Sequence, residues 1–439
     1  MTKYGKYETR PLDCWPKYIE AINKHWQDVW EAKDKGKTLI FRSGEFAHSL
    51  TAGLPDKADF QEAPYSQTIA VNRELATELS DALETMGYRD ICGAMGLPLA
   101  AILTGRAPHG KLPKPDFVLT FQVCEVEGKI GQIAAEHYDI PHFFVEAPKP
   151  VRGAKRQQHL KYLTSQIHDA IEWMEKVSGK EWDDEKFIEG VRNEWQTYAL
   201  WSKIIQLNQC IPAPLSQRHI GLLLFPAVAA GDRKWVVDLF KMGYDEIKDR
   251  VDKGIAAVAN ERCRLLHEGI PPSYFLSMFR IAEQYGVVFL GSELYFGLCG
   301  AFSASTDGSW VASETPEEQG IELRTRDNAV EALADIYLHN IPFLDDLVLA
   351  TRVDDLLKRV QDWHADGVVM HFDHGCHGVP SGMPDCKLAL DRCGIPNMTY
   401  ESSNCDPRHF SEAQVVERLK AFFEAMGLTR LTEEKASIS

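Results

Sequence analysis

The hydrophobic positions of this chain follow two patterns, helical spacing and short unbroken apolar runs. Between Trp15 and Trp30, Ile19, Ile22 and Trp26 recur at helical spacing, which predicts an amphipathic N-terminal helix. The short apolar runs predict β-strands over 38–41, 88–91, 116–123, 142–148, 263–269, 286–293, 366–372 and 395–402. Helical patterns separate most of these strands, and such alternation favours an α/β fold with parallel sheets.

The order of these elements divides the chain into two lobes. Residues 155–209 have a helical pattern almost throughout, and Pro212 and Pro214 then interrupt it. We therefore expect an N-terminal helical segment over 1–37, a first α/β lobe with a helical bridge over 38–211, and a second α/β lobe over 212–439. Helices are also expected over 71–86, within 232–261, around Ala329 and Leu356, and after a capping box of Ser411 and Gln414.

Composition and charge exclude several classes of function. The net charge of −16 opposes contact with a phosphate backbone, so we expect no nucleic-acid partner. No apolar run approaches the roughly 20 residues of a membrane helix. The N-terminus, MTKYGKYETRPLDCW, lacks the apolar segment of a signal peptide, so we expect a cytoplasmic protein without a membrane partner.

Three of the ten cysteines occupy comparable positions. Cys92 and Cys124 each follow a predicted strand, and Cys376 follows the strand DGVVMHF within the stretch DGVVMHFDHGCHG. Ligands collect beyond the carboxyl ends of the strands in parallel α/β sheets, so distant thiols delivered there can meet at one point. No CxxC pair occurs, which argues against zinc ribbons and thioredoxin-like chemistry. Three converging thiolates indicate an iron–sulfur cluster.

Two other interpretations of these residues remain open. His371, Asp373, His374, Cys376 and His377 would also suit zinc, although alternate residues of a strand face opposite ways. Alternatively, the three cysteines are buried small hydrophobic residues, which is how we interpret the remaining seven, Cys14, Cys210, Cys263, Cys299, Cys386, Cys393 and Cys405.

One carboxylate also follows a predicted strand. Glu293, in GSELYFGLCGAF, would act as an acid or base if it faces the cleft, and a solvated loop position is the plainer interpretation.

At this point the chain resembles the 2-hydroxyglutaryl-CoA dehydratase family and, within it, the B-type subunits of the ATP-dependent benzoyl-CoA reductases. The resemblance covers most of the chain. It is carried by DICGAMGLP, KLPKPDFVLTFQVC, RLLHEGIPPSYFLSMFRIAEQYGVVFLGSELYFG, DGVVMHFDHGCHG and GIPNMTYESSNCDPRHFSEAQVVERLKAFFEA. It implies two flavodoxin-like lobes with a [4Fe-4S] cluster between them, bound by Cys92, Cys124 and Cys376.

The resemblance also implies an activity and partners. Such a subunit pairs with a homologous smaller subunit, receives low-potential single electrons from an ATP-hydrolysing iron–sulfur activator, and acts on an acyl-CoA substrate. Three protein thiolates would leave one iron open to another ligand. The histidine-rich flank of Cys376 favours reduction of benzoyl-CoA, with His374 and His377 as proton donors. The alternatives are a 2-hydroxyacyl-CoA dehydratase subunit and a noncatalytic scaffold subunit.

Overall fold

Two parallel four-stranded sheets form the framework of the protein. The computed structural model describes residues 5–44, 47–108, 110–122, 124–146, 148, 156–292, 302–304, 310–346 and 352–431. The strand order is β2-β1-β3-β4 in the first sheet and β10-β9-β5-β6 in the second. The strands are β1 (Thr38–Ser43), β2 (Lys57–Gln61), β3 (Phe117–Phe121), β4 (His142–Val145), β5 (Cys263–Glu268), β6 (Val287–Ser292), β9 (Gly367–Asp373) and β10 (Asn397–Ser402).

The two sheets have the same topology. If the strands of each sheet are numbered along the chain, both orders are 2-1-3-4, and every pairing within them is parallel. This is the strand order of the flavodoxin-like doubly wound fold without its last strand. The predicted α/β class with two parallel lobes is therefore confirmed.

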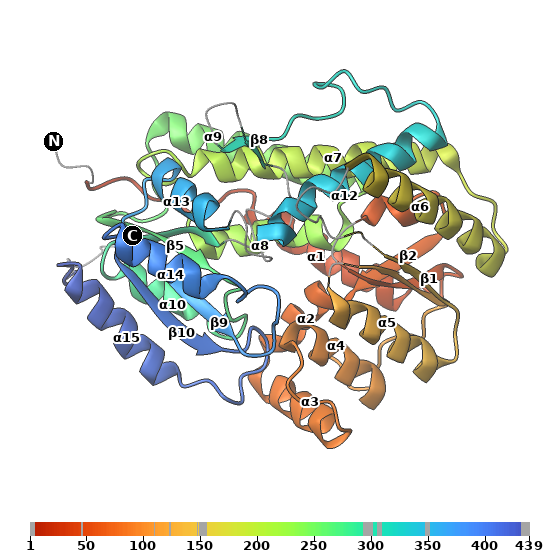
Figure 1. Cartoon of the computed structure of the whole chain (residues 1–439), viewed down its shortest axis with the longest axis horizontal. Coiled ribbons are helices and arrows are strands. Elements are labelled where there is room, and N and C mark those ends of the chain that lie inside the picture. Colours follow the sequence, from red (N-terminus) through yellow and green to blue (C-terminus); the bar gives the residue numbers. More distant parts are fainter. Residues whose placement is uncertain are drawn as a thin grey trace.

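Helices cover both faces of the first sheet. In Figure 1, α3, α4 and α5 lie on one side of it and α6 lies on the other. The helices up to the bridge are α1 (Trp15–Trp30), α2 (Glu62–Ala70), α3 (Arg73–Thr85), α4 (Gly93–Thr104), α5 (Glu125–Tyr138), α6 (Arg156–Ser178) and α7 (Asp184–Leu207), with the 3-10 helix η1 at His48–Thr51. Strands buried on both faces are rich in apolar residues, as FVLTF of β3 is.

The second half of the chain packs partly on the first lobe. Helix α9 packs against α7, and α12 packs against both α6 and α7. The helices here are α8 (Gln217–Ala230), α9 (Lys234–Lys253), α10 (Ser277–Glu283), α12 (Arg326–Asp346), α13 (Arg352–Asp362), α14 (Met383–Arg392) and α15 (Glu412–Ala425). One hydrophobic core accordingly contains Ile40 and Leu119 of the first sheet together with Leu266 and Val368 of the second. No helix in the described part of the chain is long and apolar enough to cross a membrane.

Most predicted elements occur, and four details differ. Helix α1 has the predicted bounds. The residues before Cys92 form no strand, and β2 and α2 were not predicted. A small antiparallel hairpin of β7 (Phe302–Ala304) and β8 (Trp310–Ala312) lies between β6 and α12, where no strand was predicted. The Ser411 side chain makes no capping hydrogen bond, so the predicted capping box is wrong.

Candidate functional site

Cys124 and Cys376 occupy equivalent positions in the two lobes. Cys124 follows β3 and is the N-cap residue of α5, and Cys376 lies three residues after β9. β3 and β9 are each the third strand of their sheet and pair with its first strand. The strand order reverses there, which is where doubly wound sheets bind ligands.

Cys92 reaches the same region from a loop. It is the N-cap residue of α4, and the loop before it turns at Gly87 and Asp90, whose φ angles of 95° and 52° are positive. These turns explain why the predicted strand does not form. The loop packs tightly on the second lobe, because a Cβ added to Gly375 would lie 2.5 Å from the Ile91 carbonyl oxygen.

The structure brings the three thiols into one cluster of interacting groups. A hydrogen bond between the Cys92 and Cys376 thiols raises the pKa of Cys92, which burial raises further, and lowers the pKa of Cys376. Burial and the charge of Glu127 raise the pKa of Cys124. The charge of Cys124 in turn acts on Cys92, and that of Cys376 acts on Cys124.

Hydrogen-bond donors surround these sulfurs. The Cys124 sulfur accepts from the backbone N–H of Glu127, and the backbone N–H of Val379 donates to Cys376 Sγ at 3.4 Å. The Asn404 side-chain amide donates to Cys92 Sγ at 3.8 Å. Cys92 and Cys124 also lie at helix N-termini, whose dipoles favour negative charge on sulfur. These features would stabilise the deprotonated form of the three thiols when they bind a positively charged metal group.

Three cysteine thiols are the kind of donor set that an iron–sulfur cluster takes. In the described part of the chain, no three His, Cys, Asp or Glu side chains surround a point closely enough to bind a single metal ion. A cluster spreads its ligands around a larger core, and iron–sulfur clusters take cysteine thiolates as ligands. Three interacting, largely buried thiols with N–H donors therefore fit such a group.

The histidines near Cys376 point elsewhere. His371 uses both ring nitrogens within the second lobe, at 2.6 Å from the Ile270 carbonyl oxygen and 2.7 Å from Ser402 Oγ. His374 is half exposed, with its Nε2 3.2 Å from a carboxylate oxygen of Glu401, and His377 is exposed. Zinc binding by this group is thus disfavoured, and the role of His374 and His377 as proton donors stays a prediction.

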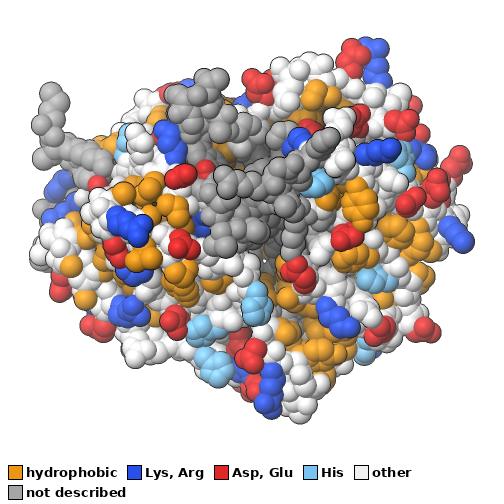
Figure 2. Space-filling model, in the orientation of Figure 1, with side chains coloured by type: hydrophobic (Ala, Val, Ile, Leu, Met, Phe, Trp, Pro, Cys, Tyr) orange, Lys and Arg blue, Asp and Glu red, His pale blue; other side chains and the backbone are white. Residues whose placement is uncertain are grey.

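His374 also lines a polar cavity on the outer side of the cysteine loops. This cavity of about 320 Å³ is bordered by Gly93 beside Cys92 and by Gly375 beside Cys376, and Arg408 and His409 line it too. Histidine side chains gather near the lower middle of the face in Figure 2, where the two lobes meet.

A buried carboxylate that sequence analysis missed lies at the same edge of the first sheet. Glu62 directly follows β2, and its Oε1 accepts hydrogen bonds from the Gly44 backbone N–H at 2.6 Å and the Ser43 hydroxyl at 3.3 Å. Its Oε2 is buried and has no hydrogen-bond partner among the described residues. Burial raises the pKa of Glu62 to about 7. It can therefore gain or lose a proton near neutral pH.

Two contacts link Glu62 to Cys124. The Ser43 hydroxyl also lies 3.0 Å from the carbonyl oxygen of Glu127, and a Glu127 carboxylate oxygen accepts from the Cys124 backbone N–H at 3.0 Å. Gly44 has a φ of 107°, and a Cβ there would lie 2.0 Å from the Phe121 carbonyl oxygen. Only glycine allows the end of β1 to approach β3 this closely. A strand-end carboxylate is the sequence signal that Glu62 shares with Glu293, which lies outside the described residues.

The other cysteines mostly behave as predicted. Cys14, Cys263, Cys386 and Cys405 are buried and Cys210 is half-buried. Cys393 is exposed because it caps the C-terminus of α14, so its predicted burial is wrong. Cys299 lies outside the described residues.

Comparison with known families identifies the group to which the chain belongs. Residues 63–426 match the profile of the 2-hydroxyglutaryl-CoA dehydratase D-component, a span that includes all three cysteines and both histidines. The chain belongs to this dehydratase family. The family inferred from the sequence is therefore confirmed.

Several members of the dehydratase family are similar over most of their length. The chain is 25% identical over 401 residues to the (R)-phenyllactyl-CoA dehydratase alpha subunit of Clostridium sporogenes, covering 90% of this chain and 91% of that protein. It is 24% identical over 426 residues to the alpha subunit of lactoyl-CoA dehydratase from Anaerotignum propionicum, covering 91% and 93%. It is 22% identical over 372 residues to the B-type subunit of benzoyl-CoA reductase from Thauera aromatica, covering 80% of each chain. The two dehydratase subunits are thus somewhat more similar than the reductase subunit, which favours the alternative activity over our first expectation.

Proposed function

We propose that this chain is the alpha-type catalytic subunit of a 2-hydroxyacyl-CoA dehydratase. The observation that carries the proposal is the buried, protonatable Glu62, which Ser43 and Glu127 link to Cys124, because elimination of water needs a base that can take a proton near neutral pH. The similarity to dehydratase alpha subunits supports the same choice. By analogy with subunits of this name, the chain would work with a second subunit and with an ATP-dependent activator that delivers electrons.

Cys92, Cys124 and Cys376 would hold the [4Fe-4S] cluster of this enzyme. When bound, the cluster would supply single electrons of low potential and, with three protein thiolates, an iron open to another ligand. The helix N-termini at Cys92 and Cys124 would stabilise the negative charge of their thiolates. Burial would exclude water from the same region.

Glu62 and Ser43 would handle the proton. Water elimination breaks the C–H bond at carbon 3 and the C–O bond at carbon 2 of the hydroxyacyl thioester. A carboxylate with a pKa of about 7 is well matched to take the first proton at neutral pH and to return it to the departing hydroxyl, which leaves as water. Ser43, whose hydroxyl lies between Glu62 and Glu127, would hold that carboxylate in place.

A second candidate function is reduction of benzoyl-CoA. The similarity to the B-type reductase chain of Thauera aromatica favours it, as does the position of His374 in the cavity bordered by Gly93 and Gly375. In that case His374 and His377 would be candidate proton donors to the ring.

Assays of the complex, purified without air and supplied with its activator, separate the two activities. We expect turnover of a 2-hydroxyacyl-CoA such as phenyllactyl-CoA or lactoyl-CoA and none of benzoyl-CoA. Ring reduction of benzoyl-CoA without dehydration of any hydroxyacyl thioester would overturn the proposal in favour of the second candidate.

A further inference from the structure

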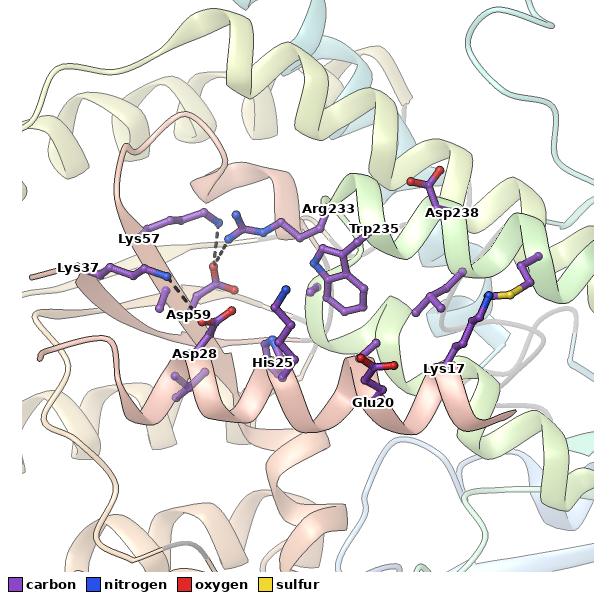
Figure 3. Close-up of a pocket in the computed structure, with 17 residues that line it drawn as sticks. Lys17, Glu20, His25, Asp28, Lys37, Lys57, Asp59, Arg233, Trp235 and Asp238 are labelled. Atoms are coloured by element: carbon purple, nitrogen blue, oxygen red, sulfur yellow. Dashed lines mark hydrogen bonds and ion pairs between the residues drawn. The ribbon is translucent and has the colours of Figure 1, made fainter. Parts of the chain in front are cut away.

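A larger cavity lies at the opposite end of the first sheet from the cysteines. Its volume is about 740 Å³, and it is lined from α1, from α9 and from the amino ends of two strands. Lys37 directly precedes β1, and Lys57 is the first residue of β2. Figure 3 shows α1 running along one side of the cavity, with Arg233 and Trp235 on the other. None of the residues that line this cavity belongs to the thiol site.

Charged side chains concentrate at one end of this cavity. A carboxylate oxygen of Asp59 lies 2.8 Å from Lys57 Nζ and 3.2 Å from a guanidinium nitrogen of Arg233, as Figure 3 shows. Lys57 and Asp59 are almost fully buried, with side-chain exposures of 2% and 3%, whereas Arg233 retains 35% exposure. Two more buried charges belong to this group, because Arg42 pairs with Asp59 and Asp232 pairs with Lys57.

The lining has one more cation than it has anions. The positive groups are Lys17, Lys24, Lys37, Lys57 and Arg233, and the negative groups are Glu20, Asp28, Asp59 and Asp238. The chain as a whole carries −16, so a pocket with a positive excess departs from the general charge. The buried and part-buried charges show the same excess, because three cations, Arg42, Lys57 and Arg233, pair with two anions, Asp59 and Asp232, and a ligand with one negative charge would balance it.

The middle of the cavity is apolar and aromatic. Trp235 is 36% exposed, and Ala21, Leu239 and Met242 line the wall with it. His25 lies opposite Trp235 in Figure 3, and burial lowers the pKa of its imidazole to about 4, so its ring is neutral at physiological pH. An exposed tryptophan beside a neutral ring offers a surface for a flat or apolar group.

We propose that this cavity binds a small monocarboxylate with an apolar or aromatic body. The carboxylate would lie at Arg233, the part-exposed member of this group of cations, because a guanidinium has N–H donors beyond the two nitrogens that pair with Asp59 and Asp232. The body would lie against Trp235. The volume is within the roughly 300–1,000 Å³ of ordinary ligand pockets. Most of the lining residues precede residue 63, where the family match begins, so the site is not defined by the region that identifies the family.

Calorimetry and ligand-observed nuclear magnetic resonance on the anaerobically purified complex test this site with phenylacetate as the probe. We expect saturable binding with a dissociation constant below about 1 mM. Phenylacetamide, which has the same body without the charge, should bind at least tenfold more weakly. Inorganic phosphate should not displace phenylacetate.

Two variants and a control localise the binding. Trp235→Ala removes the apolar surface at an exposed position and should weaken phenylacetate at least tenfold without unfolding the protein. Arg233→Lys retains the charge and loses the planar donor pair, and it should also weaken binding. Leu388→Ala, at a site 51% exposed on α14, should leave it unchanged.

Four outcomes would overturn the proposal. They are absence of saturable binding, equal binding of the amide, displacement by phosphate at equal concentration, and full binding by Trp235→Ala. Glu62→Gln distinguishes this cavity from the thiol site, because loss of phenylacetate binding in that variant with retention in Trp235→Ala would place the ligand beside the cysteines instead. None of these results depends on which acyl-CoA reaction the complex performs.

Discussion

The two lobes share one strand order, but the buried carboxylate at the end of a strand has different partners in each. Glu268 ends β5 in the second lobe and is fully buried, with Arg359 Nη1 at 2.8 Å and Arg352 Nη2 at 3.9 Å. Glu62 follows β2 in the first lobe and receives its hydrogen bonds from a neutral hydroxyl and a backbone N–H. Glu268 thus forms ion pairs with two arginines, whereas the raised pKa of Glu62 lets it gain or lose a proton near neutral pH. The same topology therefore holds a paired carboxylate in the second lobe and, in the proposed function, would supply acid–base chemistry in the first.

Replacing a cysteine ligand should have the same effect in either lobe. Replacing Cys92 of the first lobe or Cys376 of the second with serine should lower activity more than about a hundredfold, because loss of a direct ligand exceeds the effect of an outer partner. Iron content and the electron paramagnetic resonance signal should fall in both variants. Cys393→Ser, at an exposed cysteine, is the matched control and should retain both. Full activity of Cys376→Ser would instead favour a noncatalytic scaffold subunit.

Replacing the buried carboxylate of the first lobe should lower the rate of the reaction. Glu62→Gln should lower kcat by roughly 100- to 10,000-fold while the iron content stays unchanged, because the variant cannot accept a proton. The wild-type rate should rise with pH through about 7, as Glu62 loses its proton, and the variant should lack this limb. A wild-type rate in Glu62→Gln would remove this residue from the reaction.

Glu62 should also affect stability in a direction opposite to activity. Its pKa is raised from 4.5 to about 7, so the folded state holds the proton more tightly than the unfolded state does. The associated stabilisation is complete below about pH 4.5 and is lost as the pH rises through 7. Glu62→Gln should therefore exceed the wild type by about 3 kcal/mol in free energy of unfolding near pH 8 and match it in acid. Denaturant titrations at both pH values measure the difference.

The equivalent change in the second lobe should have the opposite effect on stability. Glu268→Gln leaves the buried guanidinium groups of Arg352 and Arg359 without their carboxylate, which should cost about 3–5 kcal/mol. Denaturant unfolding measures this loss. A stabilised Glu268→Gln protein would show that the two carboxylates do not differ as their partners indicate.

The smallest effect is expected at His374. Its contact with Glu401 is exposed, so His374→Gln should change the free energy of unfolding by less than about 1 kcal/mol. If the complex is a dehydratase, the variant should also retain most of its rate. A large loss of benzoyl-CoA reduction, with the iron content intact, would instead support His374 as a proton donor to the ring.

The sequence predicted those parts of the fold that local apolar patterns determine. Strands β3 and β9 occur where expected because each buries a nearly uninterrupted apolar run. Helix α1 occurs as well and buries Tyr18, Trp26 and Val29, although Ile19 of the predicted apolar face is 39% exposed. Strand β2 was missed because two of its five residues, Lys57 and Asp59, are charged and are buried only through ion pairs with distant groups. The strand predicted before Cys92 is wrong because only Tyr88 and Ile91 of its four residues are apolar, and the backbone turns at Gly87 and Asp90.

The candidate site was predicted in part for the same reason. Cys124 and Cys376 were recognised because each follows an apolar run, and Cys92 because its flanking sequence, like theirs, resembles one family. Glu62 was missed because it follows the one strand of the first sheet that was not recognised, and its unusual pKa depends on burial, which no local pattern reveals. The cavity beneath α1 likewise joins residues near Lys57 to Arg233, about which spacing along the chain says nothing.

The close packing of Gly375 on the Ile91 carbonyl has a consequence for the order in which the protein matures. Cys92 emerges from the ribosome long before Cys376, and the contact between their sulfurs cannot form until the chain beyond β9 has been made and has docked. A truncated or stalled nascent chain would present Cys92 and Cys124 without their third companion. A group that needs all three thiols could therefore be inserted only after the chain beyond β9 has packed against the loop before Cys92.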